Sequence, residues 1–417
     1  MMGTANHNKS QWVIMGLDES GPAQWREYHR LALEDAALII ADDRFHPMIG
    51  EIATVKDRLM SWPKPFSDLK DLLAKHISDK VVICTTGDPM LYGAGISVTK
   101  LFPDQPIKVL PALSGIQLAA SAMAWSLTDV EVLSVHGRAL IKLVASLYPF
   151  AKWLVVPQSA TTITDIADLL ISHGWGAAQI TCLWALGRGQ DEVITSHSAN
   201  QWLASKDIPH DGFYMVAVDL APCGRQAFLG QMAGLPDDAF ISDGKLTKQD
   251  VRASALAKLQ PHKKGVLWDL GTGAGSIAIE WARFDESCHA YGVDQLDKRL
   301  EMARENASRL GTANTSWIAG DITTIMATLP EPDAIFIGGG LSDDSLQAAM
   351  SYLPTGGRLV IHAVTLESEA ILLEAHRVHG GQLTKIAVNK AEAVGPYRGW
   401  RGLMPVTQWV YLKESVS

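Results

Sequence analysis

One short segment, residues 266–276, limits the chain to a small set of folds. Its sequence, VLWDLGTGAGS, reads as a buried strand, a glycine-rich turn and the start of a helix. Glycines at alternate positions let the backbone bend sharply and approach a ligand without a Cβ in the way. The helix that follows presents free N–H groups and a partial positive charge. A strand, turn and helix in this order are typical of an α/β domain that binds a nucleotide.

Acidic residues in and after this segment indicate which nucleotide. The glycines read GxGxG rather than the GxGxxG of dinucleotide sites, and Asp269 precedes the first of them by two residues, where it would repel a pyrophosphate but can hold an ammonium group. Asp294 ends the next expected strand and is placed to accept ribose hydroxyls. Gly320 and Asp321 close the third strand, where a short acid can receive an adenine amine. S-adenosylmethionine combines these groups with a sulfonium, so we predict it as the ligand; a tight turn that only permits packing is the alternative.

The rest of the chain alternates apolar runs of four to six residues with helical patterns, which indicates an α/β protein. A helix is expected from Thr247, where TKQD resembles a capping box with Asp in place of Glu. Two late strands, Leu383–Val388 and Thr407–Leu412, have no full helix between them. This pattern predicts a doubly wound sheet with an antiparallel edge strand.

A segment rich in Gly, Pro and Asp, Ala221–Gly244, separates two halves of the chain. We therefore expect two domains, residues 1–222 and residues 234–417. The first half has its own series of short strands, from Trp12–Met15 to Phe213–Val218.

Composition excludes several classes of protein. The net charge of −9 argues against a general nucleic-acid binder, whose affinity depends on clustered Lys and Arg. The four cysteines are far apart and form no CxxC pair, which excludes a disulfide scaffold and a cysteine-rich metal site. The start of the chain does not read as a signal peptide, and no stretch has the roughly 20 apolar residues of a spanning helix. We expect a cytoplasmic protein without a membrane or nucleic-acid partner.

Several longer segments match a known family. Asp269–Trp281, DLGTGAGSIAIEW, resembles the first motif of class I methyltransferases. The segments GKLTKQDVRASALAKLQP, FIGGGL and GGRLVIHAVTLE resemble the decarboxylating precorrin methyltransferase domain of cobalamin synthesis. In the first half, TTGDPMLYGAG, LPALSGIQLAASAMAW and SVHGR resemble a tetrapyrrole (corrin/porphyrin) methylase. Nearly the whole chain thus resembles the family of fused precorrin-6Y C5,15-methyltransferases (decarboxylating).

This resemblance implies a fold and an activity. The fold is α/β, with a two-lobed tetrapyrrole-methylase domain followed by a Rossmann-like class I methyltransferase domain. The first domain would methylate C5 of a precorrin, and the second would methylate C15 and remove carbon dioxide from the ring C acetate. Each domain would use one S-adenosylmethionine, and we expect the chain to form a homo-oligomer.

The resemblance also assigns cofactor-binding residues. In the first domain these are Gly16, Asp88, Tyr92, Ser114 and Gln117. Asp18 stands where the family usually has a second glycine in its first loop. In the second domain the residues, with Asp269, are Thr247, Gly271, Thr272, Gly273, Ala274, Gly275, Asp294, Gly320, Asp321 and Ile322. Thr247 as a plain helix cap is equally compatible with the pattern. No metal site and no catalytic side chain is identified.

A precorrin carries many carboxylates, while the chain is acidic overall, so arginines must be concentrated where the substrate binds. The candidates are Arg138 for the first site and Arg398 and Arg401 for the second. For each of them an ordinary surface arginine is the alternative.

Other functions are compatible with parts of the pattern. A class I methyltransferase with a single activity, on RNA or another small molecule, would leave the first half unexplained. A nicotinamide dehydrogenase is disfavoured by Asp269 and by the glycine spacing. A protein that senses S-adenosylmethionine without turning it over remains a non-enzymatic alternative.

Overall fold

The computed structural model describes residues 10–18, 21–22, 25–52, 55–205 and 214–414. They divide into two compact units, each treated separately below: a first unit of Met1–Arg138 with Pro149–Gln226, and a second unit of Ala139–Tyr148 with Ala227–Ser417. The second unit resumes at Ala227, between the two domains expected from the sequence. The segment Ala139–Tyr148 differs from expectation, because it packs with the second unit.

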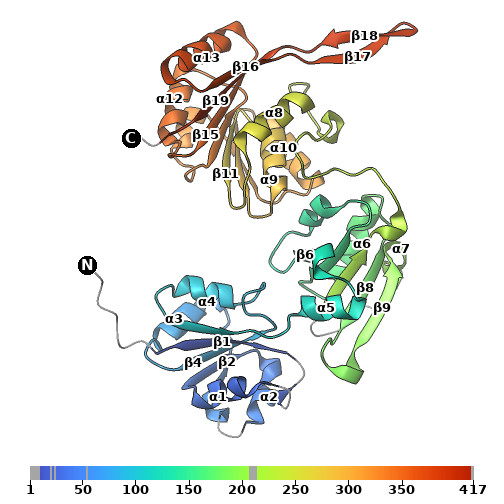
Figure 1. The fold of residues 1–417 in the computed structure, drawn as a ribbon, viewed down its shortest axis with the longest axis vertical. Coiled ribbons are helices and arrows are strands. Elements are labelled where there is room, and N and C mark those ends of the chain that lie inside the picture. The colour runs from blue at the N-terminus through green and yellow to red at the C-terminus, as the bar shows by residue number, and fades with distance from the viewer. Residues whose placement is uncertain (1–9, 19–20, 23–24, 53–54, 206–213, 415–417) are drawn as a thin grey trace. The chain divides into compact units, whose positions relative to one another are not determined.

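The first unit begins with a sheet of five parallel strands in the order β3-β2-β4-β1-β5. Successive side chains alternate between its two faces: Met15 packs on the side of α1 and α2, whereas Ile14 packs on the side of α3 and α4 (Figure 1). Helices thus cover both faces, as a parallel sheet requires. The bounds are β1 Trp12–Leu17, β2 Leu38–Ala41, β3 Leu59–Ser61, β4 Val81–Thr86, β5 Ile107–Leu110, α1 Glu27–Asp35, α2 His46–Gly50, α3 Leu69–Ala74 and α4 Gly95–Leu101.

A second sheet completes the first unit. Its order is β6-β7-β10-β8-β9, and only β6 and β7 run parallel. These two sheets are the two expected lobes. The bounds are β6 Glu131–Ser134, β7 Lys152–Val156, β8 Gln179–Trp184, β9 Val193–Ser198, β10 Tyr214–Asp219, α5 Gly115–Met123, α6 Thr162–Ser172 and α7 Ala199–Trp202.

The second unit contains a seven-stranded sheet in the order β13-β12-β11-β14-β15-β19-β16. Helices α8 and α9 cover one face, and α12 and α13 cover the other (Figure 1). The antiparallel strand expected from the sequence is β19, and it lies one position inside the edge, between β15 and β16. The bounds are β11 Val266–Leu270, β12 His289–Asp294, β13 Thr315–Ala319, β14 Ala334–Ile337, β15 Arg358–Ala363, β16 Gln382–Ile386, β19 Val406–Leu412, α8 Gln249–Leu259, α9 Ser276–Phe284, α10 Asp297–Arg309, α11 Ile322–Met326, α12 Asp343–Tyr352 and α13 Leu366–His379.

A hairpin that was not predicted from the sequence projects from the second unit and is formed by β17 (Asn389–Val394) and β18 (Tyr397–Gly402) (Figure 1). Most of its residues are exposed, so it lacks the apolar alternation that marks a strand half-buried in a sheet. The short strand β3 and the polar strand β9 were missed too. Of the expected strand Phe213–Val218, Phe213 lies outside the described residues.

The start of α8 also differs from expectation. The helix begins at Gln249 after Lys248, and Thr247 does not cap it. Instead Asp237, from a preceding segment, accepts a hydrogen bond from the Gln249 backbone N–H at 2.8 Å. The interpretation of Thr247 as an N-cap was therefore wrong, because a carboxylate distant in the chain takes that position.

Within the described ranges, no helix is long and apolar enough to cross a membrane. A search of the same residues finds no group of three or more His, Cys, Asp or Glu side chains arranged to hold a metal ion.

Candidate functional site

A cavity of about 840 Å³ opens at the carboxyl ends of the parallel strands in the second unit. Open α/β sheets bind their ligands at this edge, and the volume lies in the usual range of roughly 300–1,000 Å³ for small-molecule sites. We call it the second-site cavity. Of the residues predicted to bind the cofactor there, those that line it are Thr247, Asp269, Gly271, Thr272, Gly273, Ala274, Asp294, Asp321 and Ile322.

The glycine loop forms one wall of this cavity. At Gly271, φ is +73°, and a Cβ would lie 2.6 Å from the carbonyl oxygen of Gly339 in the loop after β14. Only glycine lets these two loops come so close. The N–H of Gly273 donates to Asp294 Oδ2 at 3.0 Å, which ties the loop to the end of β12. Gly275, the helix N-cap, is predicted to bind cofactor but does not line the cavity.

Asp269 has a structural role that the sequence did not reveal. Its side chain is almost fully buried, and Oδ2 accepts hydrogen bonds from Thr272 Oγ1 at 2.6 Å and from the Ala278 N–H at 3.1 Å. The carboxylate therefore holds both the glycine loop and the first turn of α9. Burial raises the pKa of Asp269 to about 6, although the two hydrogen bonds act in the opposite direction. A cation bound beside it would favour the charged form.

Two further acids reach the same cavity. Asp294 is 5% exposed, and its Oδ1 accepts the N–H of Leu296 at 3.0 Å. Asp321 caps α11, since its Oδ1 accepts the N–H groups of Thr323 and Thr324 at 3.0 and 3.3 Å. The hydroxyl of Thr323 is the main cause of the lowered pKa of Asp321. The structure thus brings together the three acids selected from the sequence, although they lie 25 and 27 residues apart in the chain.

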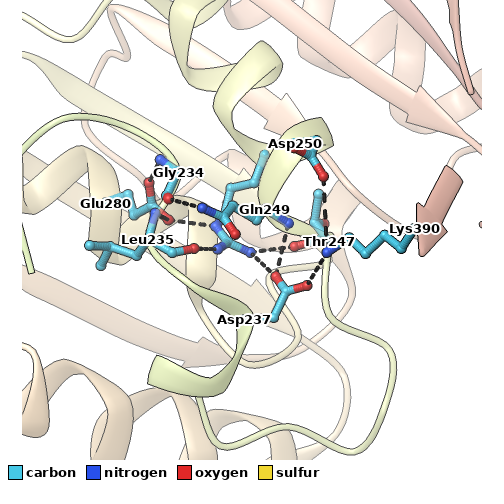
Figure 2. Close-up of polar contacts among 9 residues, drawn as sticks. Gly234, Leu235, Asp237, Thr247, Gln249, Asp250, Glu280 and Lys390 are labelled. Atoms are coloured by element: carbon cyan, nitrogen blue, oxygen red, sulfur yellow. Dashed lines mark hydrogen bonds and ion pairs between the residues drawn. The ribbon is translucent and has the colours of Figure 1, made fainter. Parts of the chain in front are cut away.

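A buried arginine, Arg252 on α8, belongs to a cluster of polar contacts that includes Asp237, Thr247 and Glu280. Figure 2 shows how these three labelled residues lie around the cluster. Its Nε donates to Glu280 Oε1 at 2.5 Å, and its Nη1 lies 3.3 Å from Asp237 Oδ1. The same guanidinium donates to the backbone carbonyls of Leu235 and Thr247. Thr247 lines the cavity, so this ion-pair cluster fixes the position of a predicted cofactor contact.

Several cavity residues were not predicted from the sequence. Lys245, Lys248 and Arg299 bring positive charge to the lining, and Phe336 and His362 lie on strands β14 and β15. Lys245, Lys248, Phe336 and His362 all occur in the segments that carried the family resemblance, so the motifs held a signal for them. Arg299 lies in α10, outside these segments, so no motif pointed to it.

The two arginines predicted for the second substrate site lie elsewhere. Arg398 and Arg401 are exposed residues of strand β18 in the hairpin and do not line the second-site cavity. Arg401 Nη1 lies 3.1 Å from Glu392 Oε2, and its side chain is 75% exposed. Their role in substrate binding stays a prediction.

The predicted residues of the first unit meet where three strands end. A Cβ on Gly16, in β1, would lie 2.1 Å from the carbonyl oxygen of Gly87 and 2.7 Å from the N of Ala112, so only glycine allows the loops after β4 and β5 to approach. Asp88 accepts a hydrogen bond from the N–H of Met90 at 2.8 Å, which shapes the turn after β4. Asp18 lines a small cavity beside this turn, of about 20 Å³.

The remaining predicted residues of the first site have partners within the chain. Ser114 and Gln117 form a capping box at the start of α5: Ser114 Oγ accepts the Gln117 N–H, and Gln117 Oε1 accepts the Ser114 N–H at 2.8 Å. The Arg138 guanidinium lies over the Tyr92 ring, 4.8 Å from its centroid. The structure thus pairs a predicted cofactor residue with the predicted substrate arginine.

Together, a glycine loop that opens a doubly wound sheet and three acids around one cavity define an α/β methyltransferase domain of class I, preceded by a two-lobed methylase unit. Comparison with known proteins agrees with both. Residues 238–413 match the model of the precorrin methyltransferase domain, and residues 30–198 match that of the tetrapyrrole (corrin/porphyrin) methylases.

Full-length relatives identify the family. A precorrin-6Y C(5,15)-methyltransferase [decarboxylating] from Sinorhizobium sp is 35% identical over 97% of this chain and 97% of its own length. A protein of the same name from Mycobacterium tuberculosis is 31% identical over 96% of this chain and 100% of its own. A probable cobalt-precorrin-6B C(15)-methyltransferase (decarboxylating) from Pyrobaculum aerophilum is 32% identical over 42% of this chain and 92% of its own. The chain belongs to the family of precorrin-6Y C5,15-methyltransferases (decarboxylating) and is an enzyme.

Proposed function

We propose that this chain methylates a precorrin twice, at C5 in the first unit and at C15 in the second, where it also removes carbon dioxide from the ring C acetate. Both steps belong to cobalamin biosynthesis. The observation that carries the proposal is the second-site cavity, whose size and acids suit a cationic amino-acid nucleoside. The C(15)-methyltransferase from Pyrobaculum aerophilum aligns with 42% of this chain, about the same share as the precorrin methyltransferase domain at residues 238–413. This agreement supports the assignment of the C15 step to the second unit.

In the second unit the chain's own residues suit S-adenosylmethionine. Asp269 offers a buried carboxylate to its ammonium group, Asp294 offers acceptors to its ribose, and the Asp321–Ile322 turn borders its adenine. The bound cofactor supplies an electrophilic methyl group. Holding the ring carbon in line with that methyl can contribute about 7–11 kcal/mol to catalysis, so a dedicated nucleophile is not required.

Positive charge near the cavity suits the substrate. Lys245 and Lys248 line it, and Arg299 lies there with Asp243 Oδ2 3.0 Å from its Nε. Carboxylates of a precorrin would pair with these groups. This assigns substrate binding to residues of the cavity itself, in addition to the predicted Arg398 and Arg401.

In the first unit we propose a second S-adenosylmethionine site at the meeting of the loops that contain Gly16, Asp88 and Ser114. Arg138, stacked on Tyr92, is the proposed contact for a substrate carboxylate. We also propose a cytoplasmic homo-oligomer, and light scattering coupled to size-exclusion chromatography measures its mass.

A substitution at one site tests the whole proposal. Asp294→Ala removes the acceptors for the N–H groups of Gly273 and Leu296 and for ribose. It should weaken cofactor binding in the second unit about 100-fold, as expected for a loss of about 3 kcal/mol in charge-assisted hydrogen bonds. Asp297→Ala, at an exposed residue of α10, is the matched control.

Calorimetry of the full chain should give two binding events for wild type and one for Asp294→Ala. Mass spectrometry should show two added methyl groups and loss of carbon dioxide with wild type, against one methyl group and no loss with the variant. Transfer of methyl groups to RNA, or cofactor binding without any transfer, would contradict the proposal.

A further inference from the structure

His362, on strand β15, lines the second-site cavity. It is 8% exposed, and its ring meets that of Phe336 edge-on with centroids 5.0 Å apart. Its Nε2 lies 2.9 Å from Oε1 of Gln408 on the neighbouring strand β19, a residue that is 1% exposed. A nearly buried histidine that lines a ligand cavity and is bonded to an uncharged partner calls for a chemical explanation.

Gln408 lies between two polar partners. Its Oε1 faces His362 Nε2 and also the Ser254 hydroxyl at 3.3 Å, whereas its buried amide nitrogen has no hydrogen-bond partner among the described residues. With the amide oxygen toward the ring, His362 Nε2 carries the hydrogen and Nδ1 has an unshared electron pair, an assignment that the ¹⁵N spectrum described below tests. Burial lowers the pKa of His362 to about 4, so the ring is neutral at neutral pH. Nδ1 has no hydrogen-bond partner among the residues that the structure describes.

The cavity wall near His362 is apolar. It includes Val364 after β15, Val388, Leu403 and Met404 from the segment before β19, and Val406 at the start of β19. A carboxylate held against such a wall loses hydration, and its departure as neutral carbon dioxide relieves that cost. A neutral His362 does not stabilise the carboxylate by an ion pair. The wall therefore suits the acetate that is lost.

We propose that His362 transfers a proton in the decarboxylating step and that Gln408 is the residue that positions its ring. This inference rests on the proposed function. The bond between the acetate methylene and its carboxyl group breaks, and the released electron pair passes through the conjugated ring to form the bond between C15 and the incoming methyl carbon. The pair of the methyl–sulfur bond stays on the sulfur. The acetate arm is left as an exocyclic methylene.

A proton must then move for this methylene to become a methyl group. His362 Nδ1 accepts a proton that the macrocycle releases from another position, and the resulting imidazolium returns it to the methylene carbon. Nε2 keeps its hydrogen bond to Gln408 throughout. The step consumes no net proton and needs no oxidant or reductant.

The first test replaces His362 by Gln in the full chain, with His376→Gln, at an exposed residue of α13, as the control. We expect kcat for the decarboxylating methylation to fall about 10²–10⁴-fold, the usual contribution of a proton-transfer residue. KM, the cofactor Kd and methylation at C5 should be unchanged, and the two unchanged binding constants show that the variant is folded. An unchanged kcat, or a rise in KM alone, overturns the role of His362.

Wild type itself separates this inference from the function on which it rests. If wild type forms neither product, the proposed function fails. If wild type forms both products and His362→Gln forms them at the same rate, only the inference fails.

The second test concerns Gln408 and does not depend on turnover. In the ¹⁵N NMR spectrum of the cofactor-free chain, the ring of His362 should show a hydrogen on Nε2. Gln408→Met should give a mixture of the two neutral forms and lower kcat about tenfold at constant KM. A hydrogen on Nδ1 in wild type, or a Gln408→Met variant with the wild-type spectrum and kcat, overturns the positioning role.

Discussion

The two candidate sites both begin at a glycine where loops meet at the ends of parallel strands, yet they differ in how ready they are for a ligand. The second site has a cavity of about 840 Å³ along a single sheet. The cavity of the first site, about 20 Å³, has room for only about one water molecule. Its walls come from both sheets of the first unit, since Leu183 and Met215 lie on β8 and β10.

This difference indicates two ways to build a cofactor site. In the second unit, one sheet forms the cavity, and a buried ion-pair cluster fixes the position of Thr247 at its wall. In the first unit, the site depends on how two sheets meet, and we expect it to widen when the cofactor binds. Substitutions that affect only one unit test this contrast.

The largest effect is expected at Arg252. Arg252→Leu leaves Glu280, with 2% of its side chain exposed, as a buried carboxylate without its ion-pair partner. Breaking a buried pair in this way costs about 3–5 kcal/mol. The free energy of unfolding of the second unit should fall by this amount, and that of the first unit should not change. Urea unfolding followed by hydrogen-exchange mass spectrometry measures the two units separately.

Arg377→Leu is the matched control, because Arg377 is exposed and pairs with Glu374 on the same helix. An exposed pair of this kind contributes less than about 1 kcal/mol. A loss below about 1 kcal/mol for Arg252→Leu, or an equal loss in the first unit, would show that the cluster does not hold the second site.

A smaller effect, with a dependence on pH, is expected at Asp269. Its pKa in the folded chain is about 6, above the roughly 3.9 of an unfolded aspartate. Between these values the folded state binds more protons, so this residue makes the second unit less stable as pH rises from about 4 to 6, by about 2–3 kcal/mol in total. Asp269→Asn keeps one side-chain oxygen that can accept from both Thr272 and Ala278, and it removes the charge.

At pH 7.5 the Asn variant should therefore be more stable than wild type by up to about 2 kcal/mol, while its cofactor affinity in the second unit falls. Chemical unfolding at a series of pH values, with calorimetry at pH 7.5, measures both quantities. Equal stability of variant and wild type at pH 7.5 would contradict a raised pKa, and unchanged affinity would remove the ammonium contact. Asp297→Asn, at an exposed acid, should change neither.

The three acids of the second site show what could be predicted from the sequence. Asp269, Asp294 and Asp321 were selected because each lies at the end of an expected strand, and a parallel sheet brings such ends to one edge. The partners of Arg252 could not be predicted in the same way. Asp237 and Glu280 lie 15 and 28 residues from it, and only the packing of α8 against α9 and against the segment before α8 brings them together.

The hairpin and the first site show what could not be predicted from the sequence. Strand β18 is exposed on most of its residues, so no hydrophobic period marks it, and the position of Arg398 and Arg401 relative to the cavity could not be derived. In the first unit, the sequence located the loops that contain Gly16, Asp88 and Ser114. The sequence did not reveal that Ser114 and Gln117 bond to each other's backbone N–H groups in a capping box, because the pattern S-x-x-Q is compatible with both a helix cap and a ligand contact.

The glycine at which each site begins can be replaced by the same residue in both units. Gly16→Ala places a Cβ against the Gly87 carbonyl, and Gly271→Ala places one against the Gly339 carbonyl. Each should cost about 1–3 kcal/mol in its own unit, since added volume in a packed region forces the backbone to shift. Gly16→Ala should abolish methylation at C5 only, and Gly271→Ala the decarboxylating methylation only, as product mass spectrometry can show.

Gly50→Ala and Gly230→Ala are the controls, because a Cβ at either position meets only open space or ordinary contacts. If Gly16→Ala stopped both activities, the two units would depend on each other and the contrast between them would be lost.

The smallest effect compares two helix caps. Ser114 and Ser342 each form a capping box, Ser114 at the first site and Ser342 at the start of α12, just after the loop of Gly338–Gly340. Replacing either by Ala should cost about 1 kcal/mol, with Ser114→Ala the more costly because Ser114 is 5% exposed and water cannot easily replace its hydroxyl. Thermal unfolding of the full chain measures both losses, and Ser114→Thr, which keeps the hydroxyl, should restore most of the stability.

Cofactor binding then separates a cap from a ligand contact. If Ser114 contacts the cofactor as well as capping α5, Ser114→Ala should raise the Kd of the first site while leaving that of the second site unchanged. Ser342→Ala should change neither Kd, because Ser342 does not line the second-site cavity. A Ser114→Ala variant that loses stability but keeps its Kd would reduce Ser114 to a helix cap, and the first site would then depend on the loops of Gly16 and Asp88 alone.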